Sequence, residues 1–376
     1  MSAPLGHDED DAATSSILYQ SADSEVVLLD IPRSMEESQV LPGEPIVRRI
    51  LSGPPASAPF PTPEPKGRGG SRTAAHNWPH QSTAAQISDL MTAATVEHAL
   101  QRLRDSYSGL FVYPRISPLV TPGAVDAREP LPVPNAVPLL GSIQDLRRRF
   151  MDIAPIFQLI VLDPPWPNRS ARRRANTYAT ATRLAEMQTL LTSIPISAHL
   201  ARDGLVAIWI TNKASIPDFL TSVNGIFTAW GVELAAEWVW VKVTASGEPL
   251  YDVNSTWRKP WEKVLIAKRI GAPTPCHLGS KVIVAVPDIH SRKPNMRRLF
   301  EDVFRQRRYR GLEVFARNLT AGWWSWGDQV LHFQDLQYWD TRQRSEAHAT
   351  KSSAISAYCQ EAVGQEAVDE NEETAS

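Results

Sequence analysis

Apolar and polar positions alternate regularly along the C-terminal two thirds of this chain. Apolar runs predict strands at 157–163, 204–211, 232–243, 262–270, 281–287 and 311–317. Between them, apolar residues at helical spacing predict helices near 183–192, 216–229 and 296–306. Because apolar strands joined by helices are typical of a sheet that is buried on both faces, the pattern predicts an α/β layer fold with a largely parallel sheet.

The N-terminal third follows a different pattern. Residues 1–80 are acidic and proline-rich, with eight prolines in the 25 residues of LPGEPIVRRILSGPPASAPFPTPEP, which predicts a disordered tail. In residues 81–138, one amphipathic helix is predicted between Ser82 and Ser106, followed by a second proline-rich connection. The predicted organisation is therefore a tail (1–80), a helical extension (81–138), a folded domain (139–345) and an acidic disordered tail (346–376).

Charge is distributed unevenly, although the net charge is only −2. Residues 1–44 carry ten acids and one base, and residues 361–376 carry six acids and no base. The remaining residues, 45–360, carry 38 bases and 25 acids. A cationic body favours a polyanionic partner such as nucleic acid. The alternative is a solvated basic surface that the acidic tails compensate.

The cysteines and the N-terminus exclude several classes of protein. The two cysteines, Cys276 and Cys359, are far apart, which argues against a disulfide framework and against a cysteine-rich zinc site. The chain starts with MSAPLGHDEDDAATSS, which lacks the basic-then-apolar order of a signal peptide. No apolar run approaches the roughly 18 residues that a membrane helix needs. We therefore expect a soluble intracellular protein without a metal site.

The tetrapeptide DPPW, Asp163 to Trp166, follows the first predicted strand of the sheet. Ligands bind beyond the carboxyl ends of strands in such sheets. The tetrapeptide offers a carboxylate, a backbone carbonyl and a flat aromatic ring, and the carbonyl is free because the prolines end the pairing of the strand. This set of groups fits a planar base with an amino group. Asp163 and the Pro164 carbonyl would accept the two N–H protons, and Trp166 would stack on the ring. The alternative is a strand-ending turn whose Asp caps a helix and whose Trp lies in the core.

The chain resembles a known family at several places. The segments LIVLDPPWPNRSARRRANTYAT, AIWITN, AAEWVWVKVTASGE, RKPWE, VPDIHSRKP and EVFARNLTAGWWSWGDQVLHFQ resemble the MT-A-seventy-like adenine N6-methyltransferases, most of all the methyltransferase-like protein four branch. The resemblance covers roughly Leu139 to Gln334. It implies a circularly permuted Rossmann-like fold, S-adenosylmethionine as cofactor and Asp163, Pro164, Pro165 and Trp166 as the catalytic tetrad.

The resemblance also assigns residues to cofactor binding. Lys293 matches the lysine that meets the methionine carboxylate of the cofactor, and Gln329 matches a polar contact. Ser142 stands where the family usually has Asp, and Asp328 stands where many members have Asn. The full predicted cofactor set is Ser142, Ile143, Asp163, Lys293, Glu313, Phe315, Arg317, Asn318, Asp328 and Gln329.

A third set of residues is predicted to meet the substrate. Four arginines directly after the tetrad are suited to neutralise phosphates, and residues 290–310 add eight bases near the same crevice. For these groups the alternative is an ordinary charged surface. The three tryptophans of WWSW, Trp323, Trp324 and Trp326, are interpreted as core more readily than as stacking platforms. The predicted substrate set is Trp166, Asn168, Arg169, Arg172, Arg173, Arg174, Lys259 and Glu262.

The resemblance implies N6-methylation of adenine in nucleic acid, with RNA favoured and 2′-O-methyladenosine of a small nuclear RNA as a plausible target. DNA adenine is the first alternative. A catalytically silent RNA-binding scaffold is the second, and Ser142 and Asp328 are the residues that support it. We expect the protein in the nucleus, with a cytoplasmic pool also compatible. The sequence identifies no protein partner, so a monomer is the working expectation.

Overall fold

A single ten-stranded sheet organises the protein. The computed structural model describes residues 15–62, 82–117, 130–167, 184–255 and 258–340. The strands follow one another across the sheet in the order β1-β2-β8-β6-β7-β5-β4-β9-β10-β3. Their bounds are β1 Ile17–Gln20, β2 Val26–Leu29, β3 Val137–Leu140, β4 Phe157–Leu162, β5 Leu200–Ile210, β6 Val232–Lys242, β7 Trp261–Arg269, β8 Lys281–Ala285, β9 Gly311–Val314 and β10 Trp324–Gly327.

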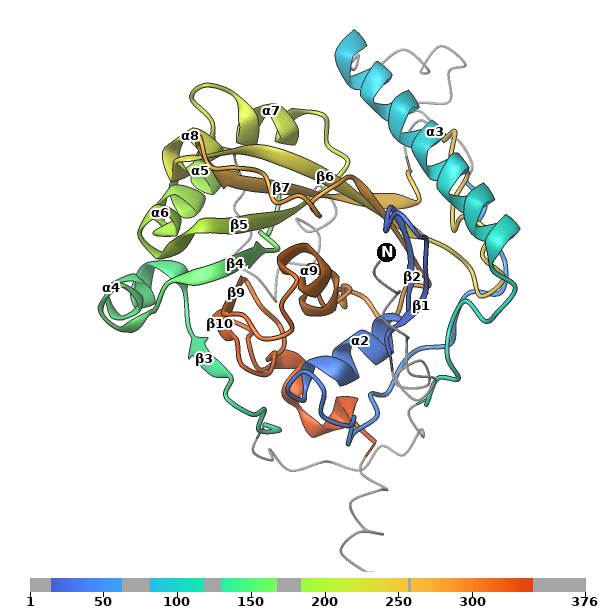
Figure 1. Cartoon of the computed structure of the whole chain (residues 1–376), viewed down its shortest axis with the longest axis horizontal. Helices are drawn as coiled ribbons and strands as arrows, with labels where there is room; N and C mark the ends of the chain where they lie inside the picture. The colour runs from blue at the N-terminus through green and yellow to red at the C-terminus, as the bar shows by residue number, and fades with distance from the viewer. Residues whose placement is uncertain (1–14, 63–81, 118–129, 168–183, 256–257, 341–376) are drawn as a thin grey trace, which may run out of the picture.

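Helices cover both faces of this sheet, which curves around α9 (Figure 1). The outer face packs against α4 (Ile143–Ile153), α5 (Leu184–Ser193), α6 (Ile196–His199), α7 (Ser215–Thr221) and α8 (Ile226–Trp230). The inner face packs against α9 (Arg297–Phe304) and α2 (Ile31–Ser38). A long helix, α3 (Thr83–Ser106), covers the outer side of β2, β8 and β6. The arrangement is a three-layer α/β fold in which apolar strands are buried on both sides.

The sequence pattern predicted the central strands and the helix between Ser82 and Ser106 correctly. The six predicted strands match β4, β5, β6, β7, β8 and β9, and the predicted helices match α5, α7 with α8, α9 and α3. Most neighbouring strands are parallel, as expected. The exceptions are β1 at the edge and β7, which runs antiparallel to both β5 and β6.

The prediction that residues 1–80 are disordered is wrong for Ile17–Ser38. This segment forms β1, β2 and α2, and β2 pairs in parallel with β8. All four residues of β2 are buried. The side chains of Val27 and Leu29 are buried on one face of the sheet, and those of Val26 and Leu28 are buried on the other. The free energy gained by this burial outweighs the acidic composition of the surrounding segment.

Local sequence explains where α2 starts. Asp30 follows β2, and its side chain accepts a hydrogen bond of 2.8 Å from the backbone N–H of Arg33. Pro32 lies in the first turn, where a missing N–H costs nothing. The chain therefore turns directly from the carboxyl end of β2 into a helix on the inner face.

Among the described residues, no helix combines the length and apolar character needed to cross a bilayer. The same residues contain no cluster of three or more His, Cys, Asp or Glu side chains suited to hold a metal ion.

Candidate active site

The carboxyl ends of the parallel strands gather the predicted site residues along one edge of the sheet. The adjacent strands β4, β9, β10 and β3 are all parallel to one another. Asp163 follows β4, Phe315 follows β9, Asp328 follows β10 and Ser142 lies just beyond β3. Because β7 runs in the opposite direction, its first residues reach the same edge and add Glu262 to it.

Asp163 and Lys293 meet at this edge. The Lys293 Nζ lies 3.3 Å from Asp163 Oδ1 and 2.6 Å from Glu262 Oε2. The same ammonium group lies 4.7 Å from the ring centre of Trp209, in cation–π contact. Lys293 is held between two carboxylates and an aromatic ring, so its position is well defined.

Glu262 extends this chain of charges to the next strand. One of its carboxylate oxygens pairs with Lys293, and the other accepts a hydrogen bond from Lys242 at the end of β6. Lys242 in turn lies over the ring of Trp240 at 4.6 Å. The result is a row of alternating charges, Lys242, Glu262, Lys293 and Asp163, contributed by β6, β7, the loop after β8 and the turn after β4.

The two cations decide the protonation state of Glu262. Burial alone would raise its pKa, but Lys293 and Lys242 lower the pKa of this carboxyl to about 2. Burial likewise acts to lower the pKa of Lys293, and Asp163 and Glu262 reverse this effect and raise it. Both groups are therefore charged at neutral pH, and the site presents a fixed ammonium beside Asp163.

A pocket opens beside this row of charges. The predicted cofactor residues Asp163, Lys293, Glu313 and Phe315 all line it, together with Arg317 and Asn318. The six consecutive residues 291–296 form one wall. The pocket thus combines three cationic residues, two carboxylates and apolar surface, as expected for a polar ligand with a flat or aliphatic part.

Glu313 is the carboxylate most affected by its surroundings. Burial is the main cause, the nearby Asp163 adds to it, and Arg317 opposes it; together they raise the pKa of Glu313 to about 8. At neutral pH this side chain is mostly protonated, so it can donate as well as accept a hydrogen bond. A neutral acid at a strand end suits the hydroxyl groups of a sugar.

The raised pKa of Glu313 predicts a pH-dependent stability. Between its ordinary pKa of 4.5 and about 8, the folded protein holds a proton that the unfolded chain has lost. The free energy of unfolding should therefore fall as the pH rises through this window. Glu313→Gln cannot ionise, so we expect it to gain stability relative to the original protein between about pH 5 and about pH 8. Urea unfolding at both pH values measures the difference, and an equal difference at both would contradict the prediction.

The backbone beside the pocket is strained. Phe315 has a φ of 62°, which is rare for a residue with a side chain. Its N–H donates to the carbonyl of Trp326 at 2.7 Å, and its Cα would lie only 3.1 Å from a Cβ placed on Gly327. Glycine at 327 therefore allows β10 to approach the turn after β9, which brings Phe315 to the pocket wall.

The remaining predicted cofactor residues lie farther along the same edge. Gly141 and Gly327 are joined by a backbone hydrogen bond of 3.1 Å, which places the turns after β3 and β10 side by side. Ser142 caps α4, and its hydroxyl also donates to the carboxylate of Asp145 at 2.7 Å. Ile143 is buried in the core. Asp328 and Gln329 follow β10, outside the residues that line the pocket.

Comparison with known proteins agrees with this geometry. The MT-A70 family model matches residues 157–329. The N6-methyladenosine RNA methyltransferase MTA1 of Cryphonectria parasitica is 48% identical over 86% of this chain and 94% of its own length. This chain belongs to the MT-A70 family.

Two further relatives define its place in that family. MTA1 of Pyricularia oryzae is 44% identical over 87% of this chain and 96% of its own length. The N(6)-adenine-specific methyltransferase METTL4 of mouse is 37% identical over 54% of this chain and 44% of its own length. The predicted family is confirmed, and the METTL4 branch, which the motifs favoured, is less similar than these two fungal proteins.

In this MT-A70 protein the DPPW motif is arranged differently from the sequence prediction. Trp166 is buried, its ring packs against Phe219, and its indole N–H donates to the carbonyl of Trp209 at 2.7 Å. The Pro164 carbonyl accepts a hydrogen bond of 2.8 Å from the Trp166 N–H. The Trp166 ring therefore anchors the motif to the core, and its stacking on a base stays a prediction. The Pro164 carbonyl keeps one lone pair for a ligand.

The predicted substrate residues are only partly placed. Asn168, Arg169, Arg172, Arg173 and Arg174 lie outside the described residues. Lys259 faces α3, where its ammonium group lies 3.7 Å from Asp89 and 5.2 Å from the ring centre of Trp261. Of the three members of this set that the structure describes, Glu262 belongs to the row of charges at the strand ends, Trp166 is buried beside it and Lys259 lies elsewhere.

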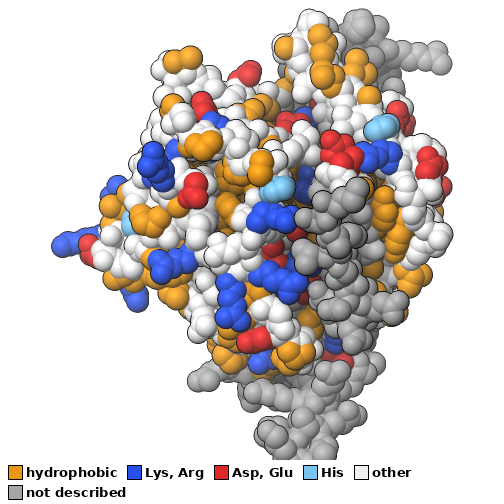
Figure 2. Space-filling model, viewed as in Figure 1, with side chains coloured by type: hydrophobic (Ala, Val, Ile, Leu, Met, Phe, Trp, Pro, Cys, Tyr) orange, Lys and Arg blue, Asp and Glu red, His pale blue; other side chains and the backbone are white. Residues whose placement is uncertain are grey.

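Of the bases in 290–310, Arg292 and Lys293 line the pocket and the other six do not, and phosphate contacts by this group stay a prediction. Arg297 is buried and donates to the carbonyls of Val40 and Glu37, and Arg298 pairs with Glu301. Residues 305–310 precede β9 and therefore lie at the opposite edge of the sheet. On the face shown in Figure 2, basic side chains are interspersed with acidic ones. Trp323 and Trp326 are buried, as the core interpretation predicted.

Several residues at the site were not identified from the sequence. Lys242 belongs to the row of charges, Trp209 contacts it, and Met35 and Arg292 line the pocket. Lys242 ends an apolar strand, so a strand-end rule would have found it. Met35 follows the apolar run VVLL and a capping Asp, a strand–helix signal that the acidic and proline-rich composition obscured.

Proposed function

We propose that this protein transfers a methyl group from S-adenosylmethionine to the N6 amine of adenine in RNA. The observation that carries the proposal is the contact between Asp163 and Lys293 in the wall of a pocket that Glu313 also lines. The family and the names of the two fungal relatives support the reaction and the class of substrate.

The residues present fit the cofactor. Lys293 supplies a partly buried positive charge for a carboxylate, and Glu313 supplies a mostly protonated acid for ribose hydroxyls. Phe315 and Trp323 add apolar surface to the same pocket. When bound, S-adenosylmethionine supplies an electrophilic methyl group at a sulfonium centre, and Lys293, Glu313 and the strand ends would hold it.

Asp163 orients the acceptor amine. The lone pair of an adenine amine is delocalised into the ring, so the amine becomes nucleophilic only when acceptors draw its protons out of that plane. Asp163 offers a carboxylate whose position is fixed by Lys293 at 3.3 Å, and the Pro164 carbonyl lies in the same turn. This is electrostatic preorganisation: Asp163 mainly orients the amine, and its second role is to accept the proton that the amine loses.

The proposal is tested by incubating the full-length protein with S-adenosylmethionine and adenine-containing oligonucleotides. Single-stranded RNA, the same RNA with 2′-O-methyladenosine at the target, and single-stranded DNA are compared, with nucleosides quantified by mass spectrometry. We expect N6-methyladenine in RNA. Methylation of DNA alone would assign the alternative substrate, and a protein that binds RNA without methylating any oligonucleotide would be a scaffold.

A further inference from the structure

The loop that carries Lys293 is held by a buried polar network. Residues 291–296 line the pocket, and within them Ser291 has a φ of 72°, a strained conformation for a residue with a side chain. Such a conformation persists only where the surroundings enforce it. The side chain of Arg292, between Ser291 and Lys293, is completely buried. The enforcing contacts therefore begin at Arg292.

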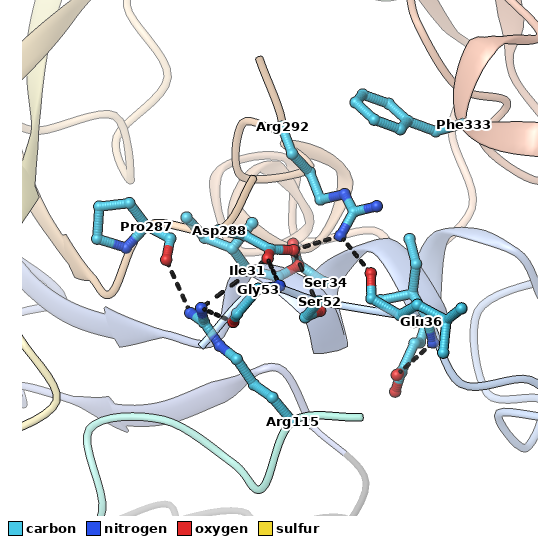
Figure 3. A network of polar contacts seen from close by, with 12 residues as sticks. Ile31, Ser34, Glu36, Ser52, Gly53, Arg115, Pro287, Asp288, Arg292 and Phe333 are labelled. Carbon is cyan, nitrogen blue, oxygen red and sulfur yellow. Dashed lines mark hydrogen bonds and ion pairs between the residues drawn. The ribbon is translucent and has the colours of Figure 1, made fainter. Parts of the chain in front are cut away.

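Arg292 joins the loop to two other parts of the chain, one N-terminal and one C-terminal (Figure 3). Its Nη1 donates to Asp288, at the start of the same loop, and to the carbonyl of Leu51 at 2.9 Å. Its guanidinium carbon lies 4.9 Å from the ring centre of Phe333 and 5.9 Å from that of Tyr338. The loop is thus fixed through one side chain to an N-terminal segment and to a C-terminal segment.

Asp288 connects the loop to the same N-terminal segment. Its carboxylate accepts hydrogen bonds from the Gly53 N–H at 3.1 Å and the Ser52 hydroxyl at 3.2 Å. Residues 51 and 52 are themselves fixed, because the Leu51 N–H donates to the carbonyl of Tyr338 and the Ser52 N–H to that of Ile116. Residues 50–53, called the splint below, connect three parts of the chain that are distant in sequence.

Arg115 completes the network from the segment after α3. Its guanidinium group donates to the carbonyls of Gly53 (2.9 Å), Val286 (3.1 Å) and Pro287 (2.9 Å). It also lies 3.9 Å from Asp288 Oδ1, and its side chain is only 4% exposed. Arg115 therefore fixes the exit of β8 relative to the splint.

We infer that the splint of residues 50–53 and the buried side chains Arg115, Asp288 and Arg292 position Lys293 for cofactor binding. Leu51, Ser52, Gly53 and Arg115 lie outside residues 157–329, the part that the family model matches. None of these four lines the pocket. They are positioning residues that act through Lys293, so parts of the chain outside the matched domain set the affinity of its pocket. The inference rests on the proposed cofactor.

A double-mutant cycle on the full-length protein tests this inference. Isothermal calorimetry measures the dissociation constant of S-adenosylhomocysteine for the original protein, Arg115→Ala, Lys293→Ala and the double variant. Lys293→Ala should raise the dissociation constant about 10- to 150-fold, since it removes a charge-assisted contact. Arg115→Ala should raise it about 5- to 50-fold in the original background and less than about twofold in the Lys293→Ala background.

Arg269→Ala is the matched control. Arg269 also donates to three backbone carbonyls, those of Ala201, Ser197 and Leu200, but it lies at the far end of β7. We expect it to lower the melting temperature and to leave the dissociation constant within about twofold. Ser52→Ala, which removes a single hydrogen bond to Asp288, is measured in the same cycle in case Arg115→Ala does not fold.

The outcomes separate the two proposals. The positioning role is supported if Arg115→Ala or Ser52→Ala lowers the affinity in the original background but not in the Lys293→Ala background. Equal losses in both backgrounds, or an equal loss in Arg269→Ala, would overturn it and leave the network as a stabilising element only. If the original protein does not bind S-adenosylhomocysteine, the proposed function itself fails.

Discussion

Replacing Asp163 with asparagine is expected to lower kcat about 100- to 1000-fold, the usual effect of removing one preorganised electrostatic contact from an active site. An amide keeps the size of the side chain, but it offers one acceptor and adds a donor that competes for the amine. Lys293 also pairs with Glu262, whose Oε2 lies 2.6 Å from its Nζ, and this ion pair does not depend on Asp163. The pocket of the variant should therefore keep its ammonium group. We therefore expect the affinity for S-adenosylhomocysteine to change little while methyl transfer is lost.

The measurement is single-turnover transfer to an RNA oligonucleotide, combined with calorimetric binding of S-adenosylhomocysteine. Asp203→Asn serves as the control, because Asp203 is an exposed acid of β5 near the end of the strand that lies away from the site. It should retain the original rate. Turnover of Asp163→Asn within about threefold of the original protein would remove Asp163 from the proposed mechanism.

Removal of residues 1–52 is expected to prevent folding. Seven apolar side chains of this segment are no more than 2% exposed: Val26, Val27, Leu28, Leu29, Ile31, Met35 and Ile50. At about 1.5–3 kcal/mol each, their burial contributes roughly 10–20 kcal/mol as an upper estimate. A typical domain is stable by only about 5–15 kcal/mol. A chain that starts at Gly53 should therefore lack a cooperative thermal transition.

The matched variant starts at Ser15 and keeps β1, β2 and α2. It should melt at the original temperature and bind S-adenosylhomocysteine as the full chain does. Both truncated chains are compared by near-ultraviolet circular dichroism and thermal unfolding. A chain starting at Gly53 that melts cooperatively at the original temperature would show that the N-terminal segment is an accessory layer and would also weaken the positioning role of the splint.

Wherever local patterns are strong, the sequence by itself determined the structure. The runs Leu159–Leu162 in β4 and Leu205–Ile210 in β5 are apolar and buried without interruption, and a strand buried on both faces requires that composition. The position of Asp163 followed from the same pattern, because two prolines end β4 directly after it. The motifs around Lys293 and Glu313 were recognisable from their residues, and the pocket contains both.

Only the tertiary structure decided which distant residues meet. The antiparallel direction of β7 brings Glu262 between Lys242 and Lys293, and no local pattern encodes the direction of a strand within a sheet. Trp166 enters the core because Trp209 and Phe219 are there to receive it. Residues 17–38 fold despite their acidic and proline-rich surroundings because β8 and α9 offer an apolar surface. Burial against distant partners supplies the free energy that composition alone could not predict.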